Sequence, residues 1–259
     1  MGKWMIVSKV EQLADYIALA NAYHVAFEIN DFFQPSVLED ELQIESIIRQ
    51  YMKYGIPEGS TLHGAFMDIV VFSNDPKIRE VSVYRMRQSM EIAKRMGVSG
   101  VVFHTNINPM LDSIEYQEDV VRNTVEVLSG LLTAYQELDL YLENMFDATP
   151  DLLCEISRQL AGYSNYGICF DYAHAMVFGE DVDAWAQAVA PYVKHVHVND
   201  NDLKHDLHLA IGDGAMDWGR FETLYQTYFS NCSVLIETTS PQWQHKSLEY
   251  LKNQTKILH

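Results

Sequence analysis

Histidines, aspartates and glutamates stand repeatedly at the ends of short apolar runs in this chain. Nine of them form one set of candidate ligands: His63, His104, Glu143, Asp171, His174, His197, Asp206, His208 and Glu237. Imidazole and carboxylate groups without thiolate are typical ligands of zinc, manganese, iron and cobalt. A lone histidine usually forms an ordinary hydrogen bond, but nine such groups on one rim would be costly unless a cation or a hydrogen-bond network satisfied them. We therefore predict a centre for one to three divalent ions, with Zn or Mn as the leading candidates.

Two short spacings within the nine candidate ligands favour a common centre. In Asp171-Tyr-Ala-His174 both polar side chains can leave the end of a strand and face one point. In Asp206-Leu-His208 the two-residue spacing directs both side chains to the same side if that stretch is extended.

Two further residues lie near the candidate ligands in the sequence pattern. His195 alternates with His197 along one apolar run, so both should face the same way and His195 should lie deeper, where it would support a ligand. Glu28 also ends an apolar run. We interpret Glu28 as hydrogen-bond support and assign it no partner.

The elements that would hold these residues follow a repeating pattern of a short apolar run and a longer amphipathic stretch. The expected strands are Trp4–Val7, Val25–Ile29, Thr61–Gly64, Gly100–His104, Leu140–Glu143, Gly167–Asp171, Val193–Val198 and Val234–Glu237. The expected helices lie near 10–21, 36–53, 78–96, 113–136, 149–161, 181–189, 217–228 and 241–256. Such alternation is typical of parallel βα units, and 259 residues suit eight of them. We predict an α/β fold with one domain over residues 1–259, a single (β/α)8 TIM barrel, with the candidate ligands at the carboxyl ends of its parallel strands.

Bulk composition narrows the function classes. The formal net charge is −18, from 36 acidic and 18 basic residues, so the average surface field repels nucleic acid and anionic membranes. The three cysteines show no Cys-x-x-Cys pairing, which makes a disulfide framework unlikely. The first residues lack a secretory signal pattern, and no apolar run approaches a membrane span. We expect a soluble, cytoplasmic protein with no membrane partner.

Seven segments around the candidate ligands, weak singly and strong jointly, resemble the xylose isomerase-like barrel superfamily, which includes endonuclease IV and many sugar isomerases and epimerases. They are LHGAF, VVFHTN, YLENMFD, FDYAH, HVHVND, DLHLAIGDG and LIETT, and the resemblance covers nearly the whole chain.

The resemblance implies two alternative activities. In the isomerase and epimerase branch, one Mn-type ion would be held by Glu143, Asp171, His197 and Glu237. Glu143 and Glu237 would then be the catalytic acid and base, and His174 and His208 would orient substrate oxygens. In endonuclease IV the nine equivalent positions bind three zinc ions, and each is matched by the same residue type here. That match implies an AP endonuclease, a phosphodiesterase that uses a multi-metal cluster.

The loops favour sugar chemistry over DNA cleavage. An enzyme that grips a duplex needs Arg and Lys around the active-site face, but the loops after the second, third, sixth and seventh strands are mainly acidic. Only Lys77, Arg79 and Lys204 offer nearby basic groups, which could equally serve a sugar phosphate. We expect a sugar or sugar-phosphate isomerase or epimerase with a small-molecule partner, and nucleic acid is the less favoured ligand. A metal-binding barrel without catalytic activity is a third hypothesis.

Aromatic residues supply candidate contacts to the carbons of a sugar. Phe33, Phe66 and Trp218 stand on segments that should reach the same rim and could form an apolar wall, although core packing is commoner for such residues. Homo-oligomers are common among sugar isomerases of this kind, and we expect that assembly is possible here.

Overall fold

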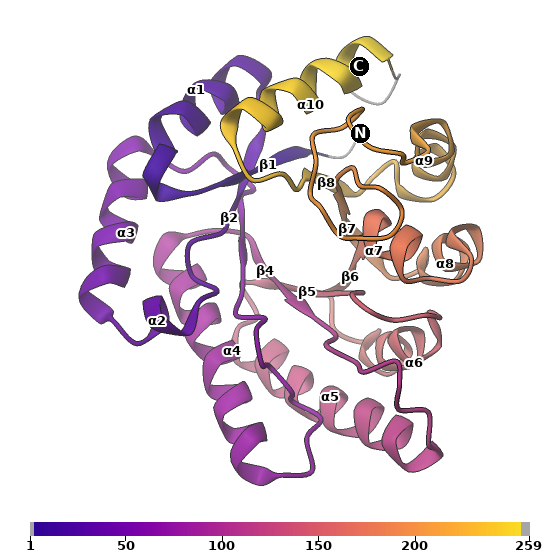
Figure 1. Cartoon of the computed structure of the whole chain (residues 1–259). Helices are drawn as coiled ribbons and strands as arrows, with labels where there is room; N and C mark the ends of the chain where they lie inside the picture. Colours follow the sequence, from indigo (N-terminus) through magenta and orange to yellow (C-terminus); the bar gives the residue numbers. More distant parts are fainter. Residues whose placement is uncertain (1–2, 255–259) are drawn as a thin grey trace.

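Eight parallel strands close into a barrel in the computed structural model, which describes residues 3–254 (Figure 1). The strands are β1 (Trp4–Ser8), β2 (Ala26–Ile29), β3 (Thr61–His63), β4 (Gly100–His104), β5 (Asp139–Glu143), β6 (Tyr166–Asp171), β7 (Val193–Val198) and β8 (Ser233–Ile236). Each pairs with its neighbours in sequence order, and β1 pairs with β8. The predicted (β/α)8 fold is confirmed, and every predicted strand boundary lies within one residue of the observed one.

Helices surround the barrel on its outside (Figure 1). The 3-10 turn η1 (Val10–Gln12) leads into α1 (Leu13–Tyr23). The others are α2 (Pro35–Leu38), α3 (Glu41–Tyr54), α4 (Pro76–Met96), α5 (Ile114–Ala134), α6 (Asp151–Leu160), α7 (Tyr172–Val177), α8 (Val182–Val189), α9 (Trp218–Leu224) with the π-turn η2 (Tyr225–Phe229), and α10 (Pro241–Gln254). The last two residues of the predicted helix 241–256 lie outside the described residues. Within 3–254, no helix is both long and apolar enough to cross a bilayer.

Two helical segments differ from the prediction. The helix expected over 36–53 is split, because Asp40 leaves the helical conformation (φ −109, ψ 92) and its side chain caps α3 by accepting from the Gln43 N–H. The segment after β6 forms the extra short helix α7, which the sequence pattern did not predict. Asp171 caps α7 by accepting from the His174 N–H at 2.6 Å, so one of the expected ligands also sets the direction of another.

The apolar core lies mainly between the strands and the surrounding helices. Alternate strand residues such as Ile6, Phe27 and Phe170 point outward into this core and are fully buried. The other face of each strand points into the barrel, where two small apolar clusters lie: Met5, Val7, Ala26 and Leu235 in one, and Val102, Tyr141 and Cys169 in the other. Between these clusters the barrel interior is polar, which is where the site is built.

Candidate metal centre

Strand register brings the predicted ligands to one level of the barrel. His104 at the end of β4 pairs with Glu143 at the end of β5. Asp171 at the end of β6 pairs in the same way with His197 of β7. Glu237 directly follows β8. Because all strands are parallel, these carboxyl ends converge on a single rim, as the sequence pattern predicted.

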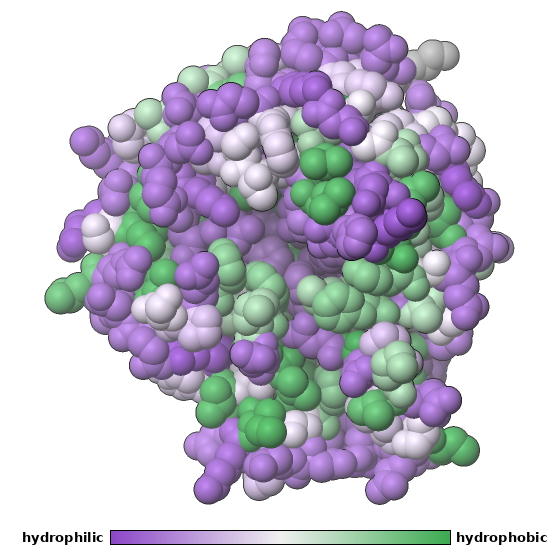
Figure 2. All heavy atoms as spheres, in the orientation of Figure 1, coloured by the Kyte–Doolittle hydropathy of each residue, from purple (hydrophilic) through white to green (hydrophobic). Residues whose placement is uncertain are grey.

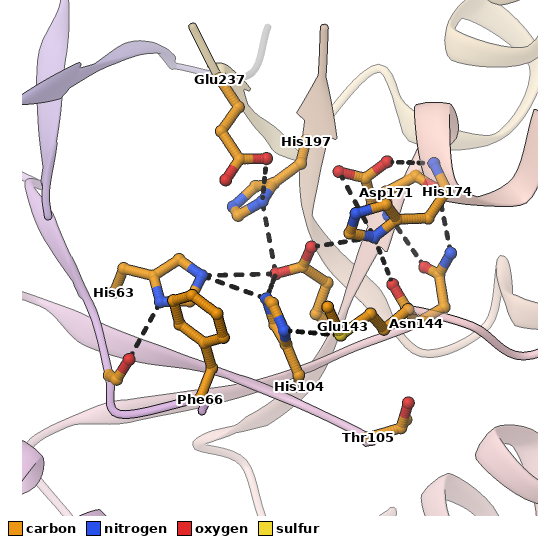
Figure 3. A network of polar contacts seen from close by, with 12 residues as sticks. His63, Phe66, His104, Thr105, Glu143, Asn144, Asp171, His174, His197 and Glu237 are labelled. Atoms are coloured by element: carbon orange, nitrogen blue, oxygen red, sulfur yellow. Dashed lines mark hydrogen bonds and ion pairs between the residues drawn. The ribbon is translucent and has the colours of Figure 1, made fainter. Parts of the chain in front are cut away.

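Four of these residues form a buried inner cluster (Figure 3). Glu143, Asp171, His197 and Glu237 each offer a ligand atom, and the four atoms lie within 4.8 Å of one another. The His197 Nδ1 is 3.4 Å from a carboxylate oxygen of Glu143 and 3.4 Å from one of Glu237. Three carboxylates and one imidazole at this spacing match the donor set of a Zn- or Mn-type ion.

Unsatisfied polar atoms test whether these residues fit a metal. Among the described residues, both Glu143 oxygens, Asp171 Oδ2, His197 Nδ1 and Glu237 Oε2 are buried and have no hydrogen-bond partner. Buried polar atoms in folded proteins nearly always have a partner, and a bound ion is one of the accepted reasons for an exception. The four residues of the inner cluster therefore fit a divalent cation.

Charges within the inner cluster lead to the same conclusion. Burial, reinforced by Glu143 and Glu237 and opposed by His174, raises the pKa of Asp171 to about 7. Burial also acts to raise the pKa of Glu143, but His197 and His104 outweigh it and hold that pKa well below its ordinary value. Without added positive charge the carboxylates would therefore compete for protons, whereas a divalent cation would stabilise all of them in the ionised form.

A second group shares Glu143 with the inner cluster. The His104 Nε2 is 3.4 Å from Glu143 Oε2, and the His63 Nε2 is 4.0 Å from the same oxygen. The two Nε2 atoms are 3.2 Å apart (Figure 3). One ligand atom from each of the three residues lies within 4.8 Å of the others, so the group is a candidate for a second ion.

The remaining three predicted ligands meet around one carboxylate. Asp206 Oδ2 is 3.3 Å from the His174 Nε2 and 2.9 Å from the His208 Nε2. His174 connects this group to the inner cluster, since its Nδ1 lies 3.4 Å from Glu143 Oε1. Burial opposes the protonation of His208, but Glu237 and Asp206 raise its pKa to about 10. The structure thus brings all nine predicted residues together in three linked groups.

The loop that carries Asp206 and His208 folds around the carboxylate of Asp200. One oxygen accepts from the Asn201 and Met216 N–H groups, and the other accepts from the Gly212 N–H and the Trp218 indole. A bridge between Asp200 and Leu209 closes the loop. Four donors to one buried carboxylate hold a long irregular segment in a single conformation, and so place its two candidate ligands.

The carboxylate of Glu28 contacts His197, a member of the inner cluster. Glu28 Oε1 lies 3.3 Å from the His197 Nε2, and Glu28 Oε2 lies 3.3 Å from the His195 Nε2. Thr61 donates its hydroxyl to Glu28 Oε2 at 2.8 Å. The Glu28 carboxylate therefore lies at ion-pair distance from His197 Nε2, which favours a proton on that nitrogen and leaves Nδ1 directed at the inner cluster. The partner that sequence reasoning left unassigned is this histidine pair.

A cavity of about 360 Å³ at the rim is lined by six of the nine residues: His63, His104, His174, Asp206, His208 and Glu237. Glu143, Asp171 and His197 are fully buried and do not line it. Figure 2 shows a hollow near the centre of this face. The stacked rings of Phe33 and Phe66, 5.1 Å apart, line the cavity as expected from the sequence. Trp218 does not: it is buried against Tyr172 and Phe221, and its indole donates to Asp200. Its predicted contact with substrate is a misassignment, because its ring packs in the core.

The basic residues near the cavity also differ from expectation. Lys77, Arg79 and Lys204 do not line it, and Lys77 and Lys204 are exposed to solvent. Among residues 3–254, the only lysine or arginine that lines the cavity is Lys9, which follows β1. Sequence reasoning missed Lys9 because no strand-end histidine or carboxylate marks that position.

Asn144 is a further residue that sequence reasoning missed. Its side chain exchanges two hydrogen bonds with the Asp171 backbone, at 2.9 and 3.0 Å, and its backbone carbonyl accepts from the His174 Nδ1 at 2.8 Å. It therefore fixes two candidate ligands at once (Figure 3). Its position directly after Glu143, at the end of a strand, is the sequence feature that could have identified it.

Comparison with known proteins identifies the family to which this barrel belongs. The model of the xylose isomerase-like TIM barrel family matches residues 14–254. The chain belongs to this family. A relative from Symbiobacterium thermophilum, a probable endonuclease 4, is 28% identical over 63% of this chain and 66% of its own length. Among solved structures, the TTHB071 protein of Thermus thermophilus, soaked with ZnCl2, has a TM-score of 0.78 at 22% identity, and a D-tagatose 3-epimerase-like protein has a TM-score of 0.75 at 24% identity, each covering 96% of both chains. Both structures share the xylose isomerase-like fold.

Proposed function

We propose that this chain is a metal-dependent sugar or sugar-phosphate isomerase or epimerase that transfers a proton next to a metal-polarised carbonyl. The observation that carries the proposal is the inner cluster, in which carboxylates of Glu143 and Glu237 each lie 3.4 Å from the His197 Nδ1. Together with Asp171 these residues would hold one Zn or Mn ion. When bound, such an ion polarises a carbonyl and its neighbouring hydroxyl and so makes the adjacent C–H more acidic.

Glu143 and Glu237 are the proposed acid and base. Glu237, directly after β8, lines the cavity, whereas Glu143, at the end of β5, is fully buried in the inner cluster. Both Glu143 oxygens and Glu237 Oε2 have no hydrogen-bond partner in the described part of the chain. One carboxylate removes the proton from the carbon beside the carbonyl. The same group or the other returns it, either to the neighbouring carbon in an isomerisation or to the opposite face in an epimerisation.

Residues around the inner cluster would position the substrate. His174 and His208 are held by Asp206 between them and are proposed to orient substrate oxygens. Phe33 and Phe66 line the cavity and are proposed to pack against the sugar carbons. The cavity volume of about 360 Å³ lies within the range of small-molecule sites. The name of one structural relative, a D-tagatose 3-epimerase-like protein, supports the same substrate class.

The test combines metal content with proton exchange. Protein purified without added metal or chelator is analysed for bound elements, and a panel of ketoses, aldoses and their phosphates is incubated with it in D2O. Deuterium incorporation beside the carbonyl, with about one Zn, Mn or Co per chain, is the expected result. Metal-loaded protein that exchanges no proton on any of these sugars would overturn the proposal.

A zinc phosphodiesterase is the second candidate, and one observation favours it. The nine predicted ligands lie in three linked groups, two of which share Glu143, and several ions would activate a water and stabilise a leaving oxygen. The acidic composition of the chain counts against a DNA substrate, and so does the cavity lining, whose described residues include a single lysine and no arginine. About three zinc ions per chain together with cleavage of abasic-site DNA would select this candidate.

A further inference from the structure

One arc of the rim carries few of the nine candidate ligands and has a different chemistry. Eight of the nine belong to β3–β7 and the segments that follow them, and Glu237 follows β8. The arc formed by the ends of β8, β1 and β2 instead bears Thr238, Lys9 and Asn30. All three line the same cavity as six of the nine candidate ligands.

Strand register makes these three residues neighbours. Ser8 pairs with Ile29, so Lys9 and Asn30 follow at one level, and the Asn30 N–H continues the ladder to the Ser8 carbonyl at 3.0 Å. On the other side, Ile6 pairs with Ile236, which places Thr238 level with Ser8. Lys9 and Asn30 therefore stand side by side, and Thr238 lies one residue lower on the adjacent strand end.

Two of the three residues have polar atoms without partners. Asn30 Oδ1 and Thr238 Oγ1 are buried and form no hydrogen bond within residues 3–254. Thr238 is only 1% exposed, yet it lines the cavity. A buried hydroxyl without a partner is costly, and a ligand in the cavity is the group that could supply one.

Lys9 is a half-buried cation without an ion pair among the described residues. The charge of Lys9 acts on Asp31 in the segment after β2, but both oxygens of Asp31 are engaged, one by the Val10 N–H and one by the Tyr51 hydroxyl. The remaining lining consists of apolar residues (Val7, Phe33, Phe66 and Met145), Thr239 and six candidate ligands. The two carboxylates among those ligands, Asp206 and Glu237, already lie beside histidines. An ammonium group in this position is suited to an anion brought by the substrate.

We propose that Lys9 and Thr238 bind an anionic group of the substrate, a phosphate ester or a carboxylate, while Asn30 Oδ1 accepts from a neighbouring hydroxyl. This inference rests on the proposed function, since it makes the substrate a charged sugar with its reacting carbons at the inner cluster and its anion at the β8–β1–β2 arc. Lysine donates three hydrogens and threonine one, which suits a tetrahedral or planar anion.

The experiment compares binding of charged and neutral forms of one sugar. Metal-loaded wild type, Lys9→Met and Lys9→Arg are titrated calorimetrically with ribulose, ribulose 5-phosphate and ribonate. Because a hydrogen bond to a charged group is worth about 10- to 100-fold in affinity, Lys9→Met should lose about that factor for the anionic ligand. The affinity for ribulose should stay unchanged, and Lys9→Arg should recover much of the affinity lost for the anionic ligand. The anion whose affinity depends on Lys9, the phosphate ester or the carboxylate, is the charged group that the subsite binds.

Controls separate this subsite from the activity. Lys77→Met, an exposed lysine outside the cavity, should bind all three ligands as wild type does. Equal weakening for neutral and anionic ligands, or no weakening for any, would overturn the subsite. Lys9-dependent anion binding without proton exchange on any sugar would instead reject the isomerase proposal and leave the subsite standing. Melting temperature and metal content of Lys9→Met, measured in parallel, establish that the variant is folded and loaded.

Discussion

Buried charge pairs determine what the site can do at the scale of single residues. Glu28 is fully enclosed, and burial alone would raise its pKa, but His197 and His195 outweigh burial and hold the pKa well below its ordinary value. Glu28 therefore stays ionised and faces the Nε2 atoms of both histidines. An ionised carboxylate behind a metal-ligating histidine fixes the tautomer and increases the basicity of the nitrogen that faces the metal.

The first prediction removes that charge. Glu28→Gln keeps the shape of the side chain but removes the negative charge beside His197 Nε2, so the dissociation constant for Zn or Mn should rise about 10- to 100-fold. Competition titration against a chromogenic chelator measures it. Glu58→Gln, at an exposed position, is the matched control. If both variants bind metal as tightly as wild type, Glu28 has no part in positioning His197.

The order and pairing of the strands explain which site residues could be predicted from the sequence and which could not. The strands are short, mainly apolar runs, and most of them carry a histidine or a carboxylate near the carboxyl end, so Glu143 or His197 could be placed from the sequence alone. Lys9 and Asn30 could not, because their meaning depends on β1 lying between β2 and β8, which only closure of the barrel creates. Trp218 was misassigned for a different reason, since a core ring and a cavity ring have the same local sequence signal.

Loop architecture yields the second prediction. Asp200→Asn replaces one acceptor oxygen with a donor that faces N–H groups, so two of the four hydrogen bonds are lost. We expect the free energy of unfolding to fall by about 2–3 kcal/mol, measured by urea denaturation. We also expect weaker metal binding at the His208 side of the site. Asp213→Asn, in the same loop but in an exposed ion pair with Lys246, should change stability by less than about 1 kcal/mol. Equal effects of the two substitutions would contradict the assignment of Asp200 as the loop's anchor.

Packing of η1 and α3 against the end of β2 yields the third prediction. Asp31 accepts from the Val10 N–H at 3.0 Å and the Tyr51 hydroxyl at 2.7 Å, and burial raises its pKa from 3.8 to about 6. The folded state therefore holds this proton more tightly than the unfolded state, so its stabilising contribution is present below about pH 4 and is lost as pH rises through 6.

Asp31→Asn should remove that pH dependence. The difference in unfolding free energy between Asp31→Asn and wild type should shift in favour of the variant by about 2–3 kcal/mol between pH 4 and pH 7. Urea denaturation across this range gives the difference directly. A difference that stays constant with pH would show that Asp31 has the same pKa in the folded and unfolded states.

At the scale of the whole molecule, metal and net charge are linked. The formal charge is −18, and four of the acidic residues, Glu143, Asp171, Asp206 and Glu237, meet within one small region of the barrel. Carboxylates gathered in a low-dielectric interior repel one another, which favours unfolding unless protons or cations neutralise them. Each divalent ion offsets two of these charges. Metal bound at the rim should thus stabilise the entire barrel, because six of the eight strands, β3 to β8, or the segments directly after them contribute to the site.

The fourth prediction follows from this linkage. With free metal about 100-fold above its dissociation constant, binding stabilises the folded state by about 2.7 kcal/mol, which corresponds to roughly 5–10 °C in Tm for a domain of this size. Excess chelator should lower the Tm by that amount, and added Zn or Mn should restore it, as scanning calorimetry would show. Glu143→Gln, which removes a carboxylate charge shared by two ligand groups, should respond much less to chelator. A wild-type Tm that chelator does not change would contradict metal as the group that satisfies the buried carboxylates, and the unpaired oxygens of Glu143 would then need another partner.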